Sequence, residues 1–281
     1  MDVNEKISGL VSLVKLPNVI VLLAAQLLAA HYVFVPHESF WTLLWHHKFI
    51  FMLLATGSAI SAGYIINHFY NIRRDWINRP QQSLLERELS MSKKLYLYFF
   101  LNFLTLVLAA FISWRAMIFF AVYIFLIWIY FHKIQSRPFW REIGVTFLTA
   151  YPFFGVMLFF KAWNPFVIWA GVLFILLLLM KESVKNHLTL RGDVAGNIKT
   201  VLVEKGEKFQ SRMFYSLAAM VIIVLLLAVK LHLPSRFIYF LYLFFVMLII
   251  ECLLYYRKNY IMAYRFIKLI IISGVFALFL L

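Results

Sequence analysis

Residues 67–75 read NHFYNIRRD, and residues 186–193 read NHLTLRGD. Each run follows a long apolar stretch, opens with Asn-His and closes on an aspartate, Asp75 or Asp193. The chain contains only one other aspartate, Asp2. Polar groups this close to membrane depth are costly unless other groups partner them, so they usually mark function. The two matched runs therefore indicate where the functional site lies. They also indicate that the chain contains two related parts, each with one run.

The composition places the chain in a membrane. Of its 281 residues, 64% are hydrophobic, 19% are aromatic and only 14% are charged. This balance excludes an ordinary soluble globule and is typical of a protein that crosses the bilayer several times. The apolar runs do not alternate with polar residues, which favours helices over strands. The single cysteine, Cys252, cannot form an internal disulfide, and we expect no removable signal peptide.

Nine apolar runs come near the ~20 residues that a membrane crossing needs. The expected helices cover 16–36, 49–67, 95–112, 115–131, 143–160, 164–181, 213–231, 236–254 and 262–281. The sequence thus predicts an all-α membrane protein, a single domain over 1–281 with two four-helix units plus one helix. Loops of roughly thirty residues are expected at 68–94 and 182–212, and loops of that length are usually functional. We expect them to cap the site.

The basic residues orient the chain. Of its 27 lysines and arginines, 22 lie in the N-terminal segment or in the connections after the second, fourth, sixth and eighth helices. The positive-inside rule therefore predicts a cytoplasmic N-terminus, cytoplasmic loops at 68–94 and 182–212, and a C-terminus on the opposite side. Anionic headgroups or a phosphorylated substrate suffice to explain the net charge of +15, without nucleic acid. We expect a multi-pass protein of the bacterial inner membrane.

Three stretches together resemble a known family. Residues 64–80 read YIINHFYNIRRDWINRP, residues 181–200 read KESVKNHLTLRGDVAGNIKT, and residues 15–18 read KLPN. The first is similar to the first aspartate-rich motif of the UbiA family of intramembrane prenyltransferases, Asn-Asp-x-x-Asp-x-x-x-Asp followed by Asn-Arg-Pro. The second is similar to that family's second motif, and the third to its Arg-x-Pro-Asn start. The resemblance covers essentially the whole chain and implies the UbiA-type fold.

The chain departs from the family motifs at several carboxylates. His68 and Asn71 stand where the first motif has aspartates, and Asn186 and Thr189 do so in the second. Six family carboxylates are thereby reduced to two, Asp75 and Asp193. The stretch after the fourth helix also differs, because it reads YFHKIQ at 130–135 and then Arg-Glu at 141–142.

The resemblance implies that a prenyl diphosphate, with about three negative charges, is held through Mg²⁺ in this family. Mg²⁺ requires oxygen ligands and neutralises the diphosphate as it leaves. By this resemblance the metal ligands are Asp75, Asp193, Asn67, Asn71, Asn186 and Glu182, the first four also being catalytic, and this reduced set suits one ion only. The diphosphate would be bound by Lys15, Asn18, Arg73, Arg74, Arg79, Lys181, Lys185, Arg191, Lys199 and Tyr130. We expect Asp75 and Asp193 to face each other across the site.

The leading function implied is transfer of a polyprenyl group from its diphosphate to a hydrophobic acceptor, a lipid phosphate or an aromatic compound, within the membrane lipids. One alternative is a non-catalytic relative that binds an isoprenoid or anionic lipid, or supports a partner enzyme. Another is a terpene cyclase or an enzyme that cleaves prenyl diphosphate. Individual residues also have simpler roles open to them. Asp75 can pair with Arg79 one helical turn on, Asn67 can cap a helix end, and His68 and His187 can be structural.

Overall fold

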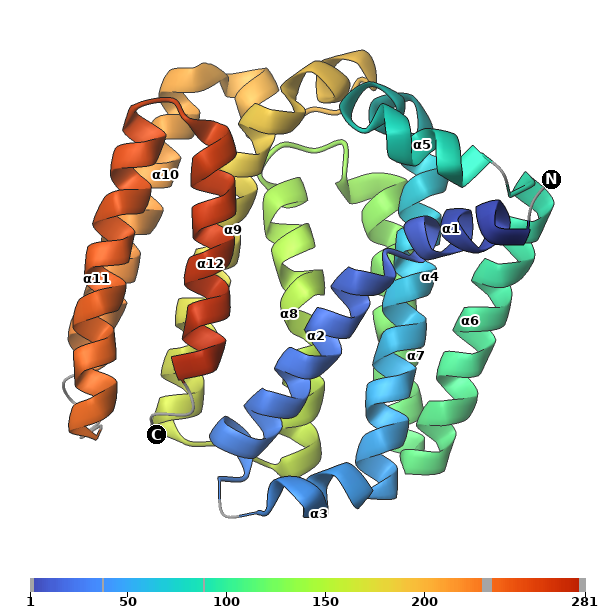
Figure 1. The fold of residues 1–281 in the computed structure, drawn as a ribbon, viewed down its shortest axis with the longest axis horizontal. Helices are drawn as coiled ribbons and strands as arrows, with labels where there is room; N and C mark the ends of the chain where they lie inside the picture. The colour runs from blue at the N-terminus through green and yellow to red at the C-terminus, as the bar shows by residue number, and fades with distance from the viewer. Residues whose placement is uncertain (1–2, 37, 88, 229–233, 278–281) are drawn as a thin grey trace. The chain divides into compact units, whose positions relative to one another are not determined.

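The computed structural model describes residues 3–36, 38–87, 89–228 and 234–277, and the elements of this part of the chain are helical. In chain order they are α1 (Val3–Val14), α2 (Leu16–Ala29), the π-helical turn η1 (Ala30–Phe34), α3 (Phe40–Trp45), α4 (His47–Asn78), α5 (Pro80–Arg87), α6 (Met91–Ile112), α7 (Trp114–Ile129), the π-helical turn η2 (Tyr130–Ile134), α8 (Trp140–Phe160), α9 (Pro165–Ala195), α10 (Val201–Leu227), α11 (Ser235–Tyr256) and α12 (Tyr260–Ala277) (Figure 1).

Nine helices within the described residues are long and apolar enough to cross a membrane. The prediction of an all-α, multi-pass membrane protein is therefore confirmed. The end of the last expected helix, residues 278–281, lies outside the described residues.

The second and sixth membrane helices are longer than the sequence predicted. The expected helix 49–67 is part of α4, which ends at Asn78, and the expected helix 164–181 is part of α9, which ends at Ala195. Most of the two expected cap loops, 68–94 and 182–212, is therefore helical: only 196–200 separates α9 from α10, and α5 follows α4 directly. The loop prediction was wrong because the helix ends were placed where the apolar residues stop. A helix can continue through polar residues when their side chains have hydrogen-bond or ion-pair partners.

One polar side chain bends α4 inside the first run. The backbone of Asn71 is not helical, with φ −119° and ψ 18°. Its side-chain Nδ2 donates 3.0 Å to the backbone oxygen of Asn67, one turn earlier. A side chain that inserts into the helical hydrogen-bond ladder in this way is a known cause of a kink. The bend thus arises from the motif residues themselves.

The chain forms two compact units. Unit 1 consists of Met1–Leu27, Glu38–Gln135 and Arg191–Asn197. Within it α4 packs against α6 and α7, and α1 contacts α4 and α5 (Figure 1). Phe51 of α4 stacks on Phe111 of α6, with 5.3 Å between ring centroids. Ala55 and Ala59 on α4 are fully buried, and such small side chains let membrane helices approach closely.

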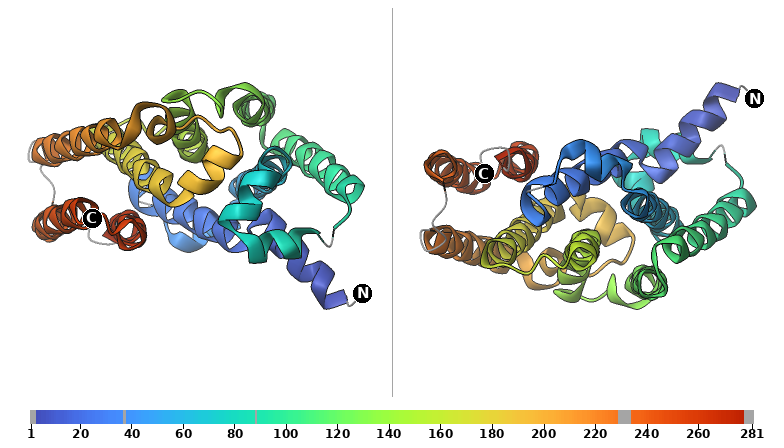
Figure 2. Two further views of the ribbon diagram at one scale, coloured as in Figure 1. Left: turned by 90° about the horizontal axis from the view of Figure 1, so that it is seen from above. Right: turned by 90° about the horizontal axis from the view of Figure 1, so that it is seen from below.

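Unit 2 consists of Leu28–His37, Ser136–Leu190 and Ile198–Leu281. Its apolar core is built by α9, α10, α11 and α12, and α11 and α12 run side by side (Figure 2). Phe214 of α10 stacks flat on Tyr255 of α11 at 3.8 Å. The second to fourth membrane helices belong to unit 1 and the fifth to ninth to unit 2, apart from the end of α9. Whether the units repeat each other, as the sequence predicted, stays a prediction.

Candidate functional site

The first run places three polar side chains on one face of α4. His68, Asn71 and Asp75 are all buried, and their spacing of three and four residues is that of neighbouring turns. Asp75 forms a close ion pair with Arg79, which is the simpler role that its helical spacing left open. Arg79 also donates from Nη1 to Oε1 of Gln82 at 3.2 Å. The carboxylate of the first run is therefore already neutralised within the helix end.

The second aspartate meets the first run in unit 1. Arg74 Nε lies 2.9 Å from Oδ1 of Asp193, which is fully buried, while Arg74 is 11% exposed. Next to this ion pair, the backbone N–H of Gly192 donates to Oδ1 of Asn78 at 3.2 Å. These contacts join the C-terminal ends of α4 and α9. The two runs, whose first members are 119 residues apart in sequence, therefore meet at Arg74 and Asp193. That Asp75 and Asp193 face each other across one site stays a prediction.

Close approach at this junction requires a glycine. A Cβ on Gly192 would lie 2.3–2.6 Å from the side-chain amide of Asn78, far inside normal contact. By contrast, a Cβ on Gly171, also on α9, would meet nothing within 4 Å.

We predict that Gly192→Ala lowers the free energy of unfolding by about 1–3 kcal/mol, because Asn78 must turn away and release the Gly192 amide. The matched variant Gly171→Ala should be neutral or stabilising by about 0.5–1 kcal/mol, as alanine favours helix. Unfolding in detergent, followed by circular dichroism, measures both. An equal response of the two variants would contradict the close contact.

A second buried cluster surrounds His68. Its Nδ1 lies 2.8 Å from Oε2 of Glu86 on α5, and its Nε2 lies 3.0 Å from Nζ of Lys94 on α6. Ser12 of α1 donates to Oε1 of Glu86 at 3.3 Å. Because an ammonium can only donate, Nε2 accepts and the ring proton faces Glu86. The histidine at this motif position thus holds α1, α5 and α6 onto α4, a structural role that the sequence left open.

The surroundings of Glu86 set its ionisation. Burial alone would raise the pKa of Glu86, but the hydrogen bond from His68 and the positive charges around it, including Arg79 and Lys15, outweigh burial and lower the pKa below its usual 4.5. The carboxylate is therefore the stable form at neutral pH.

This lowered pKa predicts a specific acid sensitivity. A carboxyl group with a depressed pKa stabilises the folded state above its unfolded-state pKa, and this stabilisation is lost as the pH falls through the folded-state value. Unfolding measured across a pH series should show stability that decreases below about pH 4.5, and Glu86→Gln should remove part of that decrease. The same change at the exposed Glu38 should leave the profile as in the wild type. Identical profiles for all three proteins would refute the assignment.

Amide side chains close the first run. Asn71 donates to Oδ1 of Asn67 at 2.8 Å, and Gln135, next to η2, donates in a short hydrogen bond to Oδ1 of Asn71. Tyr130 of η2 is buried in the same unit. The side-chain oxygens of Asn67 and Asn71, two of the three amides predicted as metal ligands, therefore accept hydrogen bonds from the protein.

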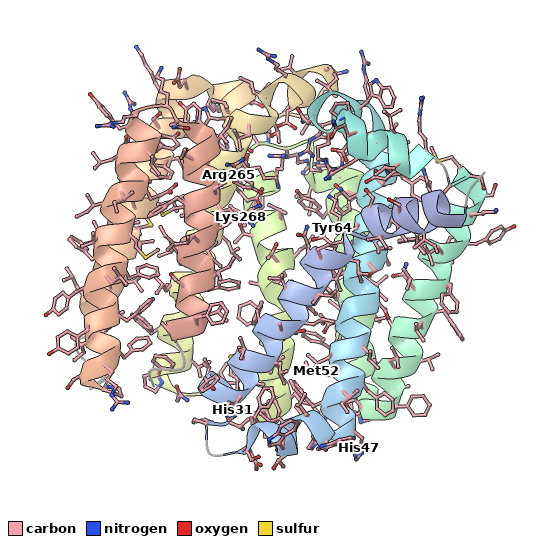
Figure 3. The ribbon with its side chains drawn as sticks, viewed as in Figure 1. His31, His47, Met52, Tyr64, Arg265 and Lys268 are labelled. Atoms are coloured by element: carbon pink, nitrogen blue, oxygen red, sulfur yellow. The ribbon has the colours of Figure 1, made fainter. Side chains whose placement is uncertain are left out.

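Two residues near the start of the chain also gather here. Lys15 Nζ lies 4.8 Å from the ring centroid of Tyr64 on α4, a cation–π contact, and Asn18 hydrogen-bonds to the same tyrosine. Figure 3 shows Tyr64 on α4 beside the junction of α1 and α2. The predicted residues Arg73 and Arg191 are exposed in this unit, and Lys199 is exposed in unit 2.

The earlier part of the second run forms a separate network in unit 2. Glu182 is buried and pairs with Lys185 at 2.8 Å and with Lys181 at 3.3 Å. Asn186 accepts from Nη1 of Arg141 at 2.7 Å and donates to Oε1 of Glu142 at 2.9 Å. Glu142 also accepts from the backbone N–H of Val201, at the start of α10, at 3.3 Å. The network thus connects the first turns of α8 and α10 to the polar part of α9.

Several of these residues were not assigned to the site from sequence. They are Glu86, Lys94, Gln135, Arg141, Glu142 and Lys268. Lys268, on α12 (Figure 3), is within electrostatic reach of Lys181 and Glu182. Ionisable residues inside an otherwise apolar span, such as Lys268, are a usable signal. For Glu86 and Gln135 no such signal exists, because their partners are distant in sequence.

The residues predicted to bind Mg²⁺ are paired with donors of the protein. Among the described residues, no group of three or more histidine, cysteine, aspartate or glutamate side chains is close enough to hold a metal ion. Every residue predicted to bind the metal through oxygen is paired with an N–H donor of the protein. The pairs are Asp75 with Arg79, Asp193 with Arg74, Asn67 with Asn71, Asn71 with Gln135, Asn186 with Arg141, and Glu182 with Lys181 and Lys185. At an effective dielectric constant of about 20, a guanidinium about 4 Å from Mg²⁺ repels it by roughly 8 kcal/mol. The arrangement in this structure therefore does not fit Mg²⁺.

The family of this chain is shown by its similarity to known proteins. Residues 18–276 match the UbiA prenyltransferase family. The chain belongs to the UbiA prenyltransferase family. A relative, digeranylgeranylglyceryl phosphate synthase of Pyrococcus horikoshii, is 29% identical over 103 residues, which is 37% of this chain and 37% of that protein. The resemblance inferred from the motifs is thus confirmed.

Solved structures agree with the family assignment. One, from work on digeranylgeranylglyceryl phosphate synthase in membranes, has a TM-score of 0.74 at 17% identity and covers 98% of this chain and 97% of that one. A UbiA homologue from Archaeoglobus fulgidus, bound to GPP and Mg²⁺, has a TM-score of 0.70 at 15% identity and covers 97% of this chain and 100% of that one. At these identities the likeness establishes the fold, and the predicted UbiA-type fold is confirmed.

Proposed function

We propose that this protein transfers a polyprenyl group from a prenyl diphosphate to a hydrophobic acceptor within the membrane. The observation that carries the proposal is the junction of the two runs in unit 1, where the Arg74–Asp193 and Arg79–Asp75 pairs lie among further cations. Family membership over 18–276 supports it, as does the fold shared with a homologue bound to GPP.

In the proposed reaction the bond between C1 of the prenyl chain and the diphosphate oxygen breaks, and both electrons leave with the diphosphate. The acceptor, through a hydroxyl oxygen or an aromatic carbon, forms the new bond to C1 and releases a proton to solvent. Cations that stabilise the negative charge on the leaving group lower the barrier most when they are fixed in advance. Apolar helices would shelter the allylic cation from water.

Residues of unit 1 have definite roles in this proposal. Arg74 and Arg79, held by their aspartates, would bind the diphosphate, because the planar guanidinium suits phosphate oxygens. Lys15 and Asn18, held at Tyr64, would contact it from the α1–α2 junction. Asp75 and Asp193 would position these arginines. A single Mg²⁺ ion, which the sequence predicted, would reach the two carboxylates only after their arginines release them.

The remaining assignments rest on the sequence. Arg73 and Arg191 are exposed cations of unit 1, and Lys181, Lys185 and Lys199 belong to unit 2; all five stay predicted diphosphate ligands, as Tyr130 does. The acceptor, a lipid phosphate or an aromatic compound, is proposed only as a class. The cytoplasmic placement of the N-terminus and of both runs follows from the distribution of positive charge. The bacterial inner membrane likewise stays a prediction.

We predict that the purified protein, given geranylgeranyl diphosphate and a lipid-phosphate or aromatic acceptor, releases diphosphate and forms a prenylated product. Mass spectrometry of the lipid extract and a phosphate assay measure the two. Release without an acceptor, with a cyclic or alcohol product, would replace transfer by cyclisation or cleavage. Failure to bind geranylgeranyl diphosphate at all would refute the proposal.

A non-catalytic lipid-binding protein is the second candidate, favoured by one observation. Every carboxylate predicted to hold a metal pairs with a cation of the protein, as Asp193 does with Arg74. Tight binding of geranylgeranyl diphosphate with no release under any condition would select this candidate.

A further inference from the structure

We propose that this protein binds the diphosphate group of its substrate through its own arginines and lysines, without a divalent metal ion. The inference rests on the proposed function and adds to it the means by which the diphosphate charge is neutralised. It follows from the pairing of side chains at the ends of α4 and α9 rather than from either motif alone.

The carboxylates that a metal would need are engaged by cations. Asp193 is fully buried against Arg74, and Asp75 is buried against Arg79. A metal ion at either carboxylate would displace a guanidinium from its partner and leave that charge beside the ion. Because both acids are buried, water cannot screen the repulsion as it does at a surface. A substrate anion has the opposite effect, since it adds negative charge where cations already lie.

The other positions of the first run offer no replacement ligands. His68 is held between Glu86 and Lys94, and Nε2, which accepts from the ammonium, faces a cation. Asn71 is held by its contacts with Asn67 and Gln135. A hard cation such as Mg²⁺ takes oxygen ligands, and several of them must converge on one ion. The oxygens available here are instead directed at separate N–H donors.

The charge balance of unit 1 suits the free anion. The cations in or beside the joined runs are Lys15, Arg73, Arg74, Arg79, Lys94 and Arg191, and the carboxylates are Asp75, Glu86 and Asp193. Cations therefore outnumber carboxylates around the joined runs, and Arg87, which lies 4.5 Å from the ring centroid of Trp76, adds to this excess. A prenyl diphosphate brings about three negative charges near neutral pH, its terminal phosphate having a last pKa near 6 as in other phosphomonoesters. This excess of positive charge suits a polyanion without a metal ion.

An arginine can pair with a carboxylate and bind a phosphate at the same time. A guanidinium carries five N–H donors in a fixed plane, so pairing with a carboxylate orients it without using all its donors. Arg79 and Lys15 both act electrostatically on Glu86, which places these two cations in one neighbourhood. The carboxylates thus act as positioning residues that hold the cations ready for phosphate.

The network of unit 2 also contains more cations than carboxylates. Glu182 is matched by Lys181 and Lys185 and lies within electrostatic reach of Lys268, while Arg141 lies next to Glu142. Four cations there accompany two carboxylates. Each network of motif residues, considered by itself, carries excess positive charge.

Binding of geranylgeranyl diphosphate to the wild-type protein in detergent, measured calorimetrically with Mg²⁺ and with excess EDTA at matched ionic strength, tests the proposal. The dissociation constants should agree within about threefold, less than 1 kcal/mol. Geranylgeraniol, which lacks the phosphates, serves as the matched ligand and should bind much more weakly. Binding that weakens tenfold or more in EDTA would overturn the metal-free site while leaving the proposed function standing. Absence of binding in both conditions would overturn the proposed function instead.

Variants further distinguish metal-free binding of the diphosphate from binding through Mg²⁺. Arg74→Gln should weaken binding about tenfold with or without Mg²⁺, the scale of one charge-assisted hydrogen bond. Lys93→Gln, which removes an exposed charge at the start of α6, should bind as the wild type does. Asp193→Asn should change binding by the same factor with Mg²⁺ and with EDTA, because Asp193 acts only through Arg74, whereas loss of a metal ligand should weaken binding only when Mg²⁺ is present. A parallel thermal unfolding series checks that each variant is folded, and the wild-type EDTA comparison decides the question if Asp193→Asn is not.

Discussion

The buried ion pair between Arg74 and Asp193 is the constraint on which the site depends. A fully buried carboxylate in a membrane protein is stable as an anion only when a cation and hydrogen-bond donors compensate for the lost hydration. Arg74 supplies that cation from the end of α4, and the end of α9 must therefore lie against it. Removing either partner would leave an uncompensated charge, which is more costly than the pair is worth.

The neighbouring contacts follow from that junction. Gly192 allows the backbone of α9 to reach Asn78, and Asp75 holds Arg79 one turn beyond Arg74. The kink at Asn71 keeps its amide between Asn67 and Gln135. The same end of α4 is held to α5 and α6 by the contacts of His68 with Glu86 and Lys94. The residues around this junction include paired arginines and a lysine, and the proposed binding of a polyanionic ligand rests on these cations.

Local features of the site were accessible from the sequence. Hydropathy predicts the nine membrane helices, and the spacing of four residues predicts the pair of Asp75 and Arg79, because both are properties of a short segment. The likeness of the two runs indicates that Asp75 and Asp193 belong to one site. The ends of α4 and α9 were misjudged, since polar residues that find distant partners extend a helix beyond its apolar part. Glu86, Gln135 and Arg141 were missed for the related reason that their partners lie 18 to 64 residues away.

Disulfide trapping at the junction of α4 and α9 tests the central claim most directly. Asn78→Cys and Gly192→Cys, combined with Cys252→Ser, place two thiols where a Cβ on Gly192 would lie 2.5 Å from Cγ of Asn78. Cγ of Asn78 marks the place where the Sγ of a cysteine would lie, and in a disulfide the Cβ of one cysteine lies about 3 Å from the Sγ of the other. Maleimide labelling of denatured membranes, before and after mild oxidation, should show both thiols lost in the double variant and neither lost in the single ones. Two thiols that stay reactive after oxidation would contradict the joining of the two runs, and with it the site built upon it.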